Sequence, residues 1–333
     1  MRAGAERLIV IVLASSALVF VCSALVSCST ADRSPGDESA QYPTRLAVEH
    51  LPNAIRLHER VISGGQPDGE AAFEELQSLG VKTIISVDGA KPNVNLAAKY
   101  GMRYVHLPHG YNGIPDQVAV KLAKAVRDFE GPIFIHCHHG KHRSPTAATV
   151  ACISNGMLQP AAATKILEFA GTSPNYAGLY QSASNARRVE DQLLDSLNAE
   201  FPEIAKLPPF AEAMVELEHT FDHLKRLASS GWKAIEDQPD LDPAHEALLL
   251  FEHFTEMLRL ESVAQEPAEF RKLLEESQAD SQQLESLLRV RQAANSNLEN
   301  SLENKLEIDS AMKRVSTNCA ACHKLFRDIP LSQ

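Results

Sequence analysis

The chain has 333 residues, of which 44% are hydrophobic and 23% are charged, a composition that excludes a disordered protein. Its formal net charge of −11 argues against nucleic acid as a bulk electrostatic partner. An anionic ligand would therefore have to be bound by a local positive site. The six cysteines could form disulfides in an exported protein, but most of them lie in motifs that suggest other roles.

Residues 1–28 have the pattern of an export signal. Arg2 and Arg7 precede an uncharged apolar run over 8–26, the order found in secretory signals, although a run of this length could also stay in the bilayer as an anchor. The sequence that ends in Cys28 resembles the lipobox of bacterial lipoproteins, which implies cleavage before Cys28 and its lipidation. We therefore expect a lipid-anchored, periplasm-facing protein of the bacterial envelope. Residues 29–45, rich in Ser, Asp and Pro, would form a flexible tether.

The following segment, 46–200, alternates β-rich runs with helical patterns. Strands are expected over 54–57, 61–63, 83–87, 104–107 and 133–136. Helices are expected over 70–79, 116–129, 145–154, 160–170 and 176–198. This alternation predicts an α/β domain with a mostly parallel sheet flanked by helices. Ligands of such domains bind at the carboxyl ends of the strands.

The run from His136 to Ser144 lies at such an end, and Pro145 after it favours the start of a helix. A strand, a tight loop and a helix N-terminus bind phosphate, because backbone N–H groups converge on the anion and the helix dipole favours it. Cys137 is the candidate nucleophile, and Arg143 can hold two phosphoryl oxygens. Ser144 could donate to the sulfur as it leaves the phosphocysteine intermediate. The other candidate phosphate-binding residues are His138, His139, Gly140, Lys141 and His142.

The run HCX5RS resembles the protein tyrosine and dual-specificity phosphatases over about residues 50–180. The resemblance implies hydrolysis of phosphate monoesters through a phosphocysteine intermediate. Three alternatives stay open: a rhodanese-like activity, a zinc site made by the loop His and Cys residues, and a domain that binds phosphorylated ligands without turnover. Cationic loop side chains would favour a highly anionic substrate, such as phosphotyrosine, an inositol phosphate or a phospholipid head group.

The general acid is harder to assign. These phosphatases protonate the leaving oxygen with an upstream aspartic acid, but the corresponding segment here, 107–112, contains no Asp. Asp116 is the first candidate, and its alternative role is the N-cap of a helix. Asp88 and His109 are the other candidates. Cys152, in an apolar stretch, is expected to be a small buried hydrophobic residue.

From about residue 210 the β signal ends. Helices are expected over 210–229, 244–261, 267–292 and 297–326, and the apolar spacing in the first of them is typical of an antiparallel bundle. We expect residues 205–333 to form an all-α four-helix bundle, which could also mediate a homodimer.

The last predicted helix carries Cys319, Cys322 and His323 as a CxxCH run, the attachment pattern of c-type haem. Two thiols three residues apart reach the two vinyl groups, and the histidine is placed to ligate the iron. A redox dithiol and a zinc half-site are the alternatives. The terminal position of the run resembles cytochrome c-prime and its low-spin relatives over about 205–333. This resemblance implies one covalent haem c, with His323 as axial ligand and Arg327 near the haem edge.

Met214 is the best candidate for the distal side of the haem, because it lies on the apolar seam of its helix while His219 and His223 lie opposite. Ligation by Met214 would favour electron transfer with a redox partner. A Met214 that only lines the pocket would leave iron able to bind NO or CO. The expected protein is thus an envelope phosphatase with a haem domain for electron transfer or gas and redox sensing. The alternative is a haem carrier or sensor whose phosphatase-like half only binds phosphorylated ligands.

Overall fold

The computed structural model describes residues 43–233, 235–236, 238–293 and 298–328. The export signal, Cys28 and nearly all of the predicted tether lie outside these residues. The tether was expected to extend to residue 45, but β1 (Thr44–Arg45) already pairs with the sheet. Within the described ranges, no helix is both long enough and apolar enough to cross a membrane.

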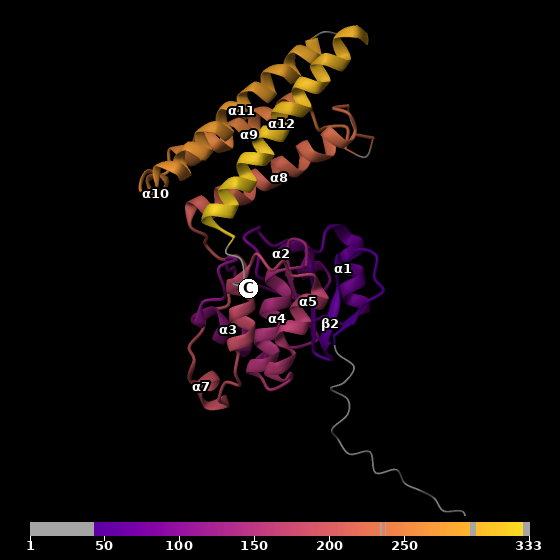
Figure 1. The fold of residues 1–333 in the computed structure, drawn as a ribbon. Helices are drawn as coiled ribbons and strands as arrows, with labels where there is room; N and C mark the ends of the chain where they lie inside the picture. Colours follow the sequence, from indigo (N-terminus) through magenta and orange to yellow (C-terminus); the bar gives the residue numbers. More distant parts are fainter. Residues whose placement is uncertain (1–42, 234, 237, 294–297, 329–333) are drawn as a thin grey trace, which may run out of the picture. The chain divides into compact units, whose positions relative to one another are not determined.

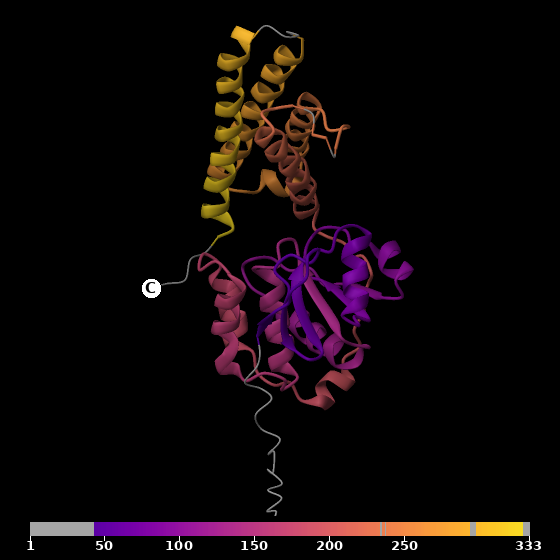
Figure 2. The ribbon, with the colours of Figure 1, turned by 90° about the vertical axis from the view of Figure 1, so that its right-hand side faces the viewer.

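A mixed sheet forms the centre of the N-terminal region, and Figure 2 shows its strands in indigo and purple. In the described part of the chain its order is β1-β2-β3-β6-β4-β5. The longer strands are β2 (Ile55–His58), β3 (Val61–Gly65), β4 (Thr83–Ser86), β5 (Arg103–His106) and β6 (Ile133–Cys137). Strands β3, β6, β4 and β5 run parallel, and β1 and β2 form an antiparallel edge. All five predicted strands are confirmed to within two residues.

Helices bury both faces of this sheet, because successive strand residues point to opposite sides. Ile84, Tyr104 and Phe134 lie in one core with α1 (Gly69–Ser78) and α2 (Val94–Lys99). Their neighbours Ile85 and Val105 lie in the other core. That core contains residues of α3 (Asp116–Asp128), α4 (Arg143–Ser154), α5 (Ala163–Ala170) and α6 (Ala177–Asn185). A short 3₁₀ turn, Pro160–Ala162, precedes α5. The strands are therefore nearly continuous apolar runs in the sequence.

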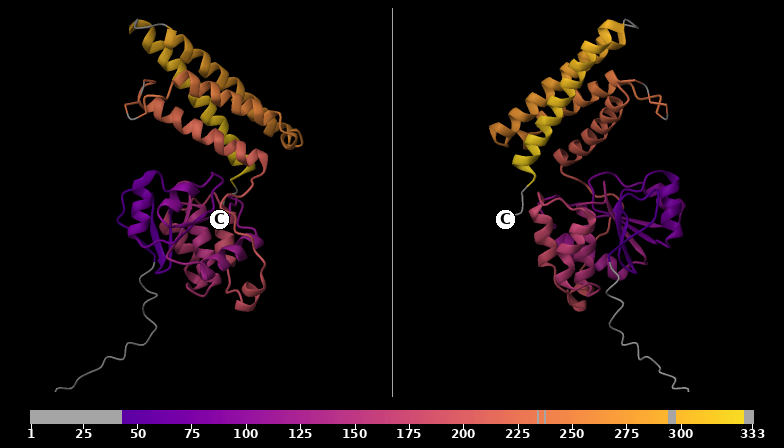
Figure 3. Two further views of the ribbon diagram at one scale, coloured as in Figure 1. Left: turned by 180° about the vertical axis from the view of Figure 1, so that it is seen from behind. Right: turned by 45° about the vertical axis from the view of Figure 1, so that its right-hand side comes forward.

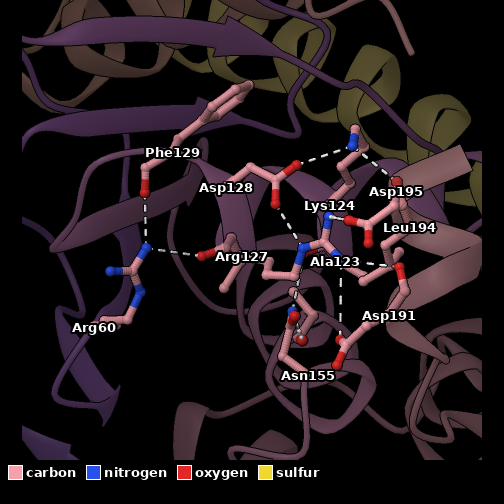
Figure 4. Close-up of polar contacts among 12 residues, drawn as sticks. Arg60, Ala123, Lys124, Arg127, Asp128, Phe129, Asn155, Asp191, Leu194 and Asp195 are labelled. Atoms are coloured by element: carbon pink, nitrogen blue, oxygen red, sulfur yellow. Dashed lines mark hydrogen bonds and ion pairs between the residues drawn. The ribbon is translucent and has the colours of Figure 1, made fainter. Parts of the chain in front are cut away.

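The helix predicted over 176–198 is wrong as a single element, since α7 (Asp191–Ser196) is separate from α6. Polar contacts attach α7 to α3 (Figure 4). Arg127 Nη2 lies 2.7 Å from Asp195 Oδ1, and Lys124 Nζ donates to the Leu194 carbonyl at 2.8 Å. Arg60 Nη2 donates to the carbonyl of Phe129 after the end of α3, at 2.7 Å. Lys124 and Arg127 thus fix α7 against α3 through tertiary contacts that local periodicity does not encode.

The C-terminal region is helical, as predicted. It contains α8 (Pro209–Ser229), α9 (Pro243–Leu258), α10 (Glu261–Ala264), α11 (Ala268–Ala293) and α12 (Leu298–Phe326). The long helices match the expected ranges to within three residues, whereas α10 was not expected. Figures 1 and 3 show α11 and α12 side by side. The helices share an apolar core drawn from residues 210–322, while the cores around the sheet are drawn from 46–201.

Candidate active site

The loop between β6 and α4 combines a buried thiol with unpaired hydrogen-bond donors. Cys137 ends β6, and Arg143 is the first residue of α4, which begins two residues earlier than predicted. Within the part of the chain that is described, the N–H groups of residues 139–142 have no acceptor. Arg143 Nε is also buried without a partner. Donors gathered at a helix N-terminus are what an anion-binding loop requires.

The loop can adopt this shape only because residue 140 is glycine. Gly140 has a φ of +72°, and a Cβ placed on it would lie 2.4 Å from Gly65 N and 2.5 Å from Gly64 C, at the end of β3. Asn53 Nδ2 holds the loop from outside by donating to the carbonyls of Gly140 at 2.7 Å and Ala170 at 2.9 Å. The sequence named Gly140 as a candidate phosphate-binding residue but gave no indication of Asn53, since its contacts lie 87 and 117 residues away along the chain.

Ser144 contacts the nucleophile candidate. Its Oγ lies 3.3 Å from Cys137 Sγ and donates to the Gly64 carbonyl at 2.9 Å. A hydroxyl has one hydrogen, so in this arrangement Ser144 accepts from the thiol S–H. When the sulfur is a thiolate, the same hydrogen can turn toward it. The position fits the predicted role of Ser144 in helping the sulfur to leave.

Asp88 reaches into the loop from the end of β4. Its Oδ2 accepts from the His138 N–H at 2.6 Å and from Arg143 Nη2 at 2.8 Å, and its Oδ1 accepts from the N–H of Gly89 at 2.6 Å. Burial alone would raise the pKa of Asp88, but the Arg143 guanidinium and the N–H donors of Ala90 and His138 outweigh it and lower the pKa to about 2. Asp88 is therefore ionised. It accepts from two donors of the loop region, the His138 N–H and Arg143 Nη2, which lie beside the unpaired N–H groups.

Two aromatic side chains, Tyr111 and Tyr176, form an aromatic wall beside Arg143. The guanidinium carbon of Arg143 lies 4.6 Å from the ring centroid of Tyr111, within the range of a cation–π interaction. The Tyr176 ring lies 4.5 Å from Tyr111 and 4.9 Å from His142, between centroids. Burial raises the pKa of Tyr111 to about 12, so this ring stays neutral. Sequence reasoning missed both tyrosines, because neither belongs to the loop motif.

Two of the loop histidines, His139 and His142, do not supply the expected charge. Burial, followed by the charges of His139 and Arg143, lowers the pKa of His142 to about 4, and burial also lowers the pKa of His139. The prediction that these two side chains are cationic is wrong near neutral pH, although their N–H groups remain available. His109 is buried, its Nδ1 contacts the Gly110 carbonyl at 2.9 Å, and its Nε2 has no partner.

Asp116 is not brought to the loop. It is exposed, and it lines a pocket of about 510 Å³ with Val150 and Ser154, which lie in the C-terminal half of α4. Cys137 and Arg143 lie at the opposite end of that helix. The N-cap alternative for Asp116 is also wrong, because Pro115 occupies that position and Asp116 is the first helical residue. Cys152 is fully buried and unpaired, as predicted, and burial raises its pKa.

Across the described ranges, no group of three or more His, Cys, Asp or Glu side chains is arranged to hold a metal ion. The loop cysteine and histidines therefore do not form the zinc site considered as an alternative. Lys141 is exposed, so its side chain adds a positive charge at the solvent side of the loop.

The residues of the CxxCH run fit covalent attachment of a haem. Cys319 and Cys322 are free thiols, and both belong to the apolar cluster of the helical region together with Met214. Burial raises the pKa of Cys319 to about 11 and lowers that of His323 to about 4, so the imidazole is neutral, as an iron ligand must be. His323 Nε2 lies 3.5 Å from Arg327 Nη1. Iron bound through Nε2 would therefore require Arg327 to move away from the ring.

No protein-family model matches the chain, and no curated protein matches it. Some solved structures are similar to the N-terminal part. A crystal structure of P. aeruginosa TpbA in complex with phosphotyrosine is 19% identical, and the similarity covers 44% of this chain and 91% of that one, with a TM-score of 0.38. The core catalytic domain of the PP-IP phosphatase SIW14 from S. cerevisiae is 17% identical over 45% of this chain and 93% of that one, with a TM-score of 0.37. Similarities at this level do not establish an activity.

Proposed function

We propose that the chain is a cysteine-dependent phosphatase that hydrolyses phosphate monoesters. The observation that carries this proposal is the set of unpaired donors around Cys137, namely the N–H groups of residues 139–142 and the buried Nε of Arg143. Three phosphoryl oxygens can accept all of these bonds, and the buried thiol lies at the start of the same loop.

The reaction follows from these positions. The Cys137 thiolate attacks phosphorus, an S–P bond forms, and the bond from phosphorus to the ester oxygen breaks. The leaving oxygen takes a proton from an acid. Water then attacks the phosphocysteine, the S–P bond breaks, and inorganic phosphate leaves. Arg143 and the loop N–H groups hold the phosphoryl oxygens in both steps, and Ser144 donates to the departing sulfur.

We assign the proton donor to Asp88 in place of Asp116. Asp88 contacts Arg143 and the loop, whereas Asp116 lines a pocket at the other end of α4. A phosphate dianion that takes over the Arg143 donors would remove the contact that lowers the pKa of Asp88 and would add a second negative charge beside it. Both changes raise that pKa and favour the protonated acid.

Turnover of aryl phosphates by purified full-length protein tests this function. Wild type should release phenol and phosphate, and Cys137→Ser should bind inorganic phosphate without turnover. Cys152→Ser, which changes a buried cysteine outside the loop, is the matched control and should keep full activity. Phosphate binding by wild type without any turnover would instead favour a phospho-ligand sensor.

We propose a second function for the helical region, a four-helix bundle of the cytochrome c-prime type with one covalent haem c. Cys319 and Cys322 would form the thioether bonds, His323 would be the axial ligand, and Met214 would line the distal side. When bound, the haem would supply electron transfer or reversible binding of a gas. The supporting observation is that both free thiols and Met214 share one apolar cluster. Haem staining of a denaturing gel should be positive for wild type and negative for Cys319→Ser/Cys322→Ser.

We also propose that Cys28 is lipidated and anchors the protein to an envelope membrane. The support is the sequence of residues 1–28. Wild type should fractionate with membranes, whereas Cys28→Ala should lose the lipid modification in mass spectrometry.

A further inference from the structure

Arg327, which follows α12, contacts the aromatic wall of the candidate phosphatase site. Its guanidinium carbon lies 4.9 Å from the ring centroid of Tyr111, the ring that also lies 4.6 Å from the guanidinium carbon of Arg143. The two guanidinium carbons are thus at most about 10 Å apart, since each lies within cation–π range of one ring. Arg143 is buried, whereas Arg327 is half-buried, so Arg327 lies nearer to solvent.

The terminal nitrogens of Arg327 are poorly paired. Its Nε donates to Asp328 Oδ1 at 2.7 Å, and this contact orients the side chain. In contrast, among the described residues, which end at Asp328, Nη2 makes only contacts of 3.4 Å to Asp328 and 3.5 Å to the Tyr176 hydroxyl, and Nη1 lies 3.5 Å from His323. These distances exceed the usual 2.7–3.2 Å of a hydrogen bond. A carboxylate or phosphate oxygen would be a much better acceptor for this guanidinium.

We propose that Arg327 is a substrate-selecting residue that binds a second anionic group of the substrate, a phosphate or a carboxylate, while Arg143 binds the scissile phosphate. The proposal rests on the phosphatase function proposed above. Arg327 would give the C-terminal region a direct part in substrate recognition. It would favour substrates whose second anionic group lies within about 10 Å of the scissile phosphate.

The test uses the full-length protein as isolated and compares phenyl phosphate with 2-, 3- and 4-carboxyphenyl phosphate. Arg327→Gln should lower kcat/KM for at least one carboxyphenyl phosphate by about tenfold, the effect of one charge-assisted hydrogen bond, and leave phenyl phosphate unchanged. Arg327→Lys should retain part of the preference for that carboxyphenyl phosphate over phenyl phosphate. Lys324→Gln, which removes an exposed cation from the same end of α12, should leave kcat/KM unchanged for both kinds of substrate.

Two further readouts separate this proposal from its alternatives. Unchanged absorption spectra and thermal unfolding of Arg327→Gln would show that the effect does not arise from a disturbed His323 or a damaged fold. An equal loss with all substrates, or no loss with any, would overturn the proposal. If wild type turns over none of them, the phosphatase function fails, but calorimetry still tests Arg327. Arg327→Gln should weaken the binding of pyrophosphate and leave the binding of inorganic phosphate unchanged. Equal effects on both ligands would overturn the proposal.

Discussion

Asp88 Oδ2 accepts from Arg143 Nη2 at 2.8 Å, and the same oxygen accepts from the His138 N–H at 2.6 Å. One carboxylate at the end of β4 thereby fixes both the arginine and the first residue after the nucleophile candidate. Asp88 takes Nη2, whereas the buried Nε of Arg143 has no partner among the described residues. The Asp88 carboxylate therefore holds Arg143 at the candidate phosphate site in the structure as it stands.

Asp88→Asn should lower kcat for phenyl phosphate by about 10²- to 10⁴-fold, the range of general acid catalysis. The amide keeps the shape of the side chain but has no acidic proton to transfer. The loss should be much smaller for 2,4-dinitrophenyl phosphate, because its leaving oxygen needs little protonation. Steady-state rates with the two substrates measure the difference.

Asp116→Asn is the matched control for this prediction, since it makes the same change at an exposed position away from the loop. Its rates with both substrates should equal those of wild type. An equal loss with both substrates in Asp88→Asn would contradict the acid role and would leave Asp88 as a positioning residue for Arg143.

The contrast between Asp88 and Asp116 shows what the sequence could and could not provide. The strands were predictable because buried strands are short apolar runs, and the loop was predictable from its residue types. Asp88 was named as a candidate, but the choice between it and Asp116 could not be made from the sequence. It depends on the position of β6 between β3 and β4, an order that brings together residues 50 positions apart. Tyr111 and Asn53 were missed because neither belongs to the loop motif, and their contacts with Arg143 and Gly140 join residues far apart in the chain.

Gly140→Ala should destabilise the N-terminal region by roughly 3 kcal/mol or more and abolish turnover. The new Cβ would meet backbone atoms of Gly64 and Gly65, which cannot rotate away, at a φ that disfavours side chains. Gly101→Ala is the matched control, since its φ is +71° with nothing within 4 Å of the added carbon. It should cost about 1 kcal/mol and leave turnover unchanged. Denaturation and aryl phosphate assays check both, and similar effects of the two variants would argue against the close approach of β3.

Ser144→Ala should slow the breakdown of the phosphocysteine and spare its formation. Its hydroxyl lies 3.3 Å from Cys137 Sγ, so its loss removes a donor to the departing thiolate. Rapid mixing with an aryl phosphate should give a burst of phenol followed by a steady rate about tenfold lower, the effect of one lost hydrogen bond of about 1.4 kcal/mol. Ser154→Ala, at the other end of α4, should give neither change. A slower burst in Ser144→Ala would place the hydroxyl in the first step instead.

The last prediction concerns the pH dependence of stability and arises from His109. Burial lowers its pKa in the folded protein to about 4 from an ordinary value of 6.5. Between these values the unfolded chain binds the proton and the folded protein does not, so the free energy of unfolding should fall as the pH falls from 6.5 to 4. One such histidine contributes about 3 kcal/mol over this window, and His136, lowered to about 4 mainly by burial, acts in the same direction.

His109→Gln should remove the contribution of His109 to this fall in the free energy of unfolding. The substitution will also change packing, so the informative quantity is the difference in unfolding free energy between pH 7 and pH 4, not the value at either pH. Trp232, the single tryptophan, belongs to the helical region and would not report on the sheet. Urea unfolding should therefore be followed by hydrogen exchange of peptides from β6. A slope as steep in His109→Gln as in wild type would contradict this prediction, because His109 would then bind its proton equally well in the folded and the unfolded protein.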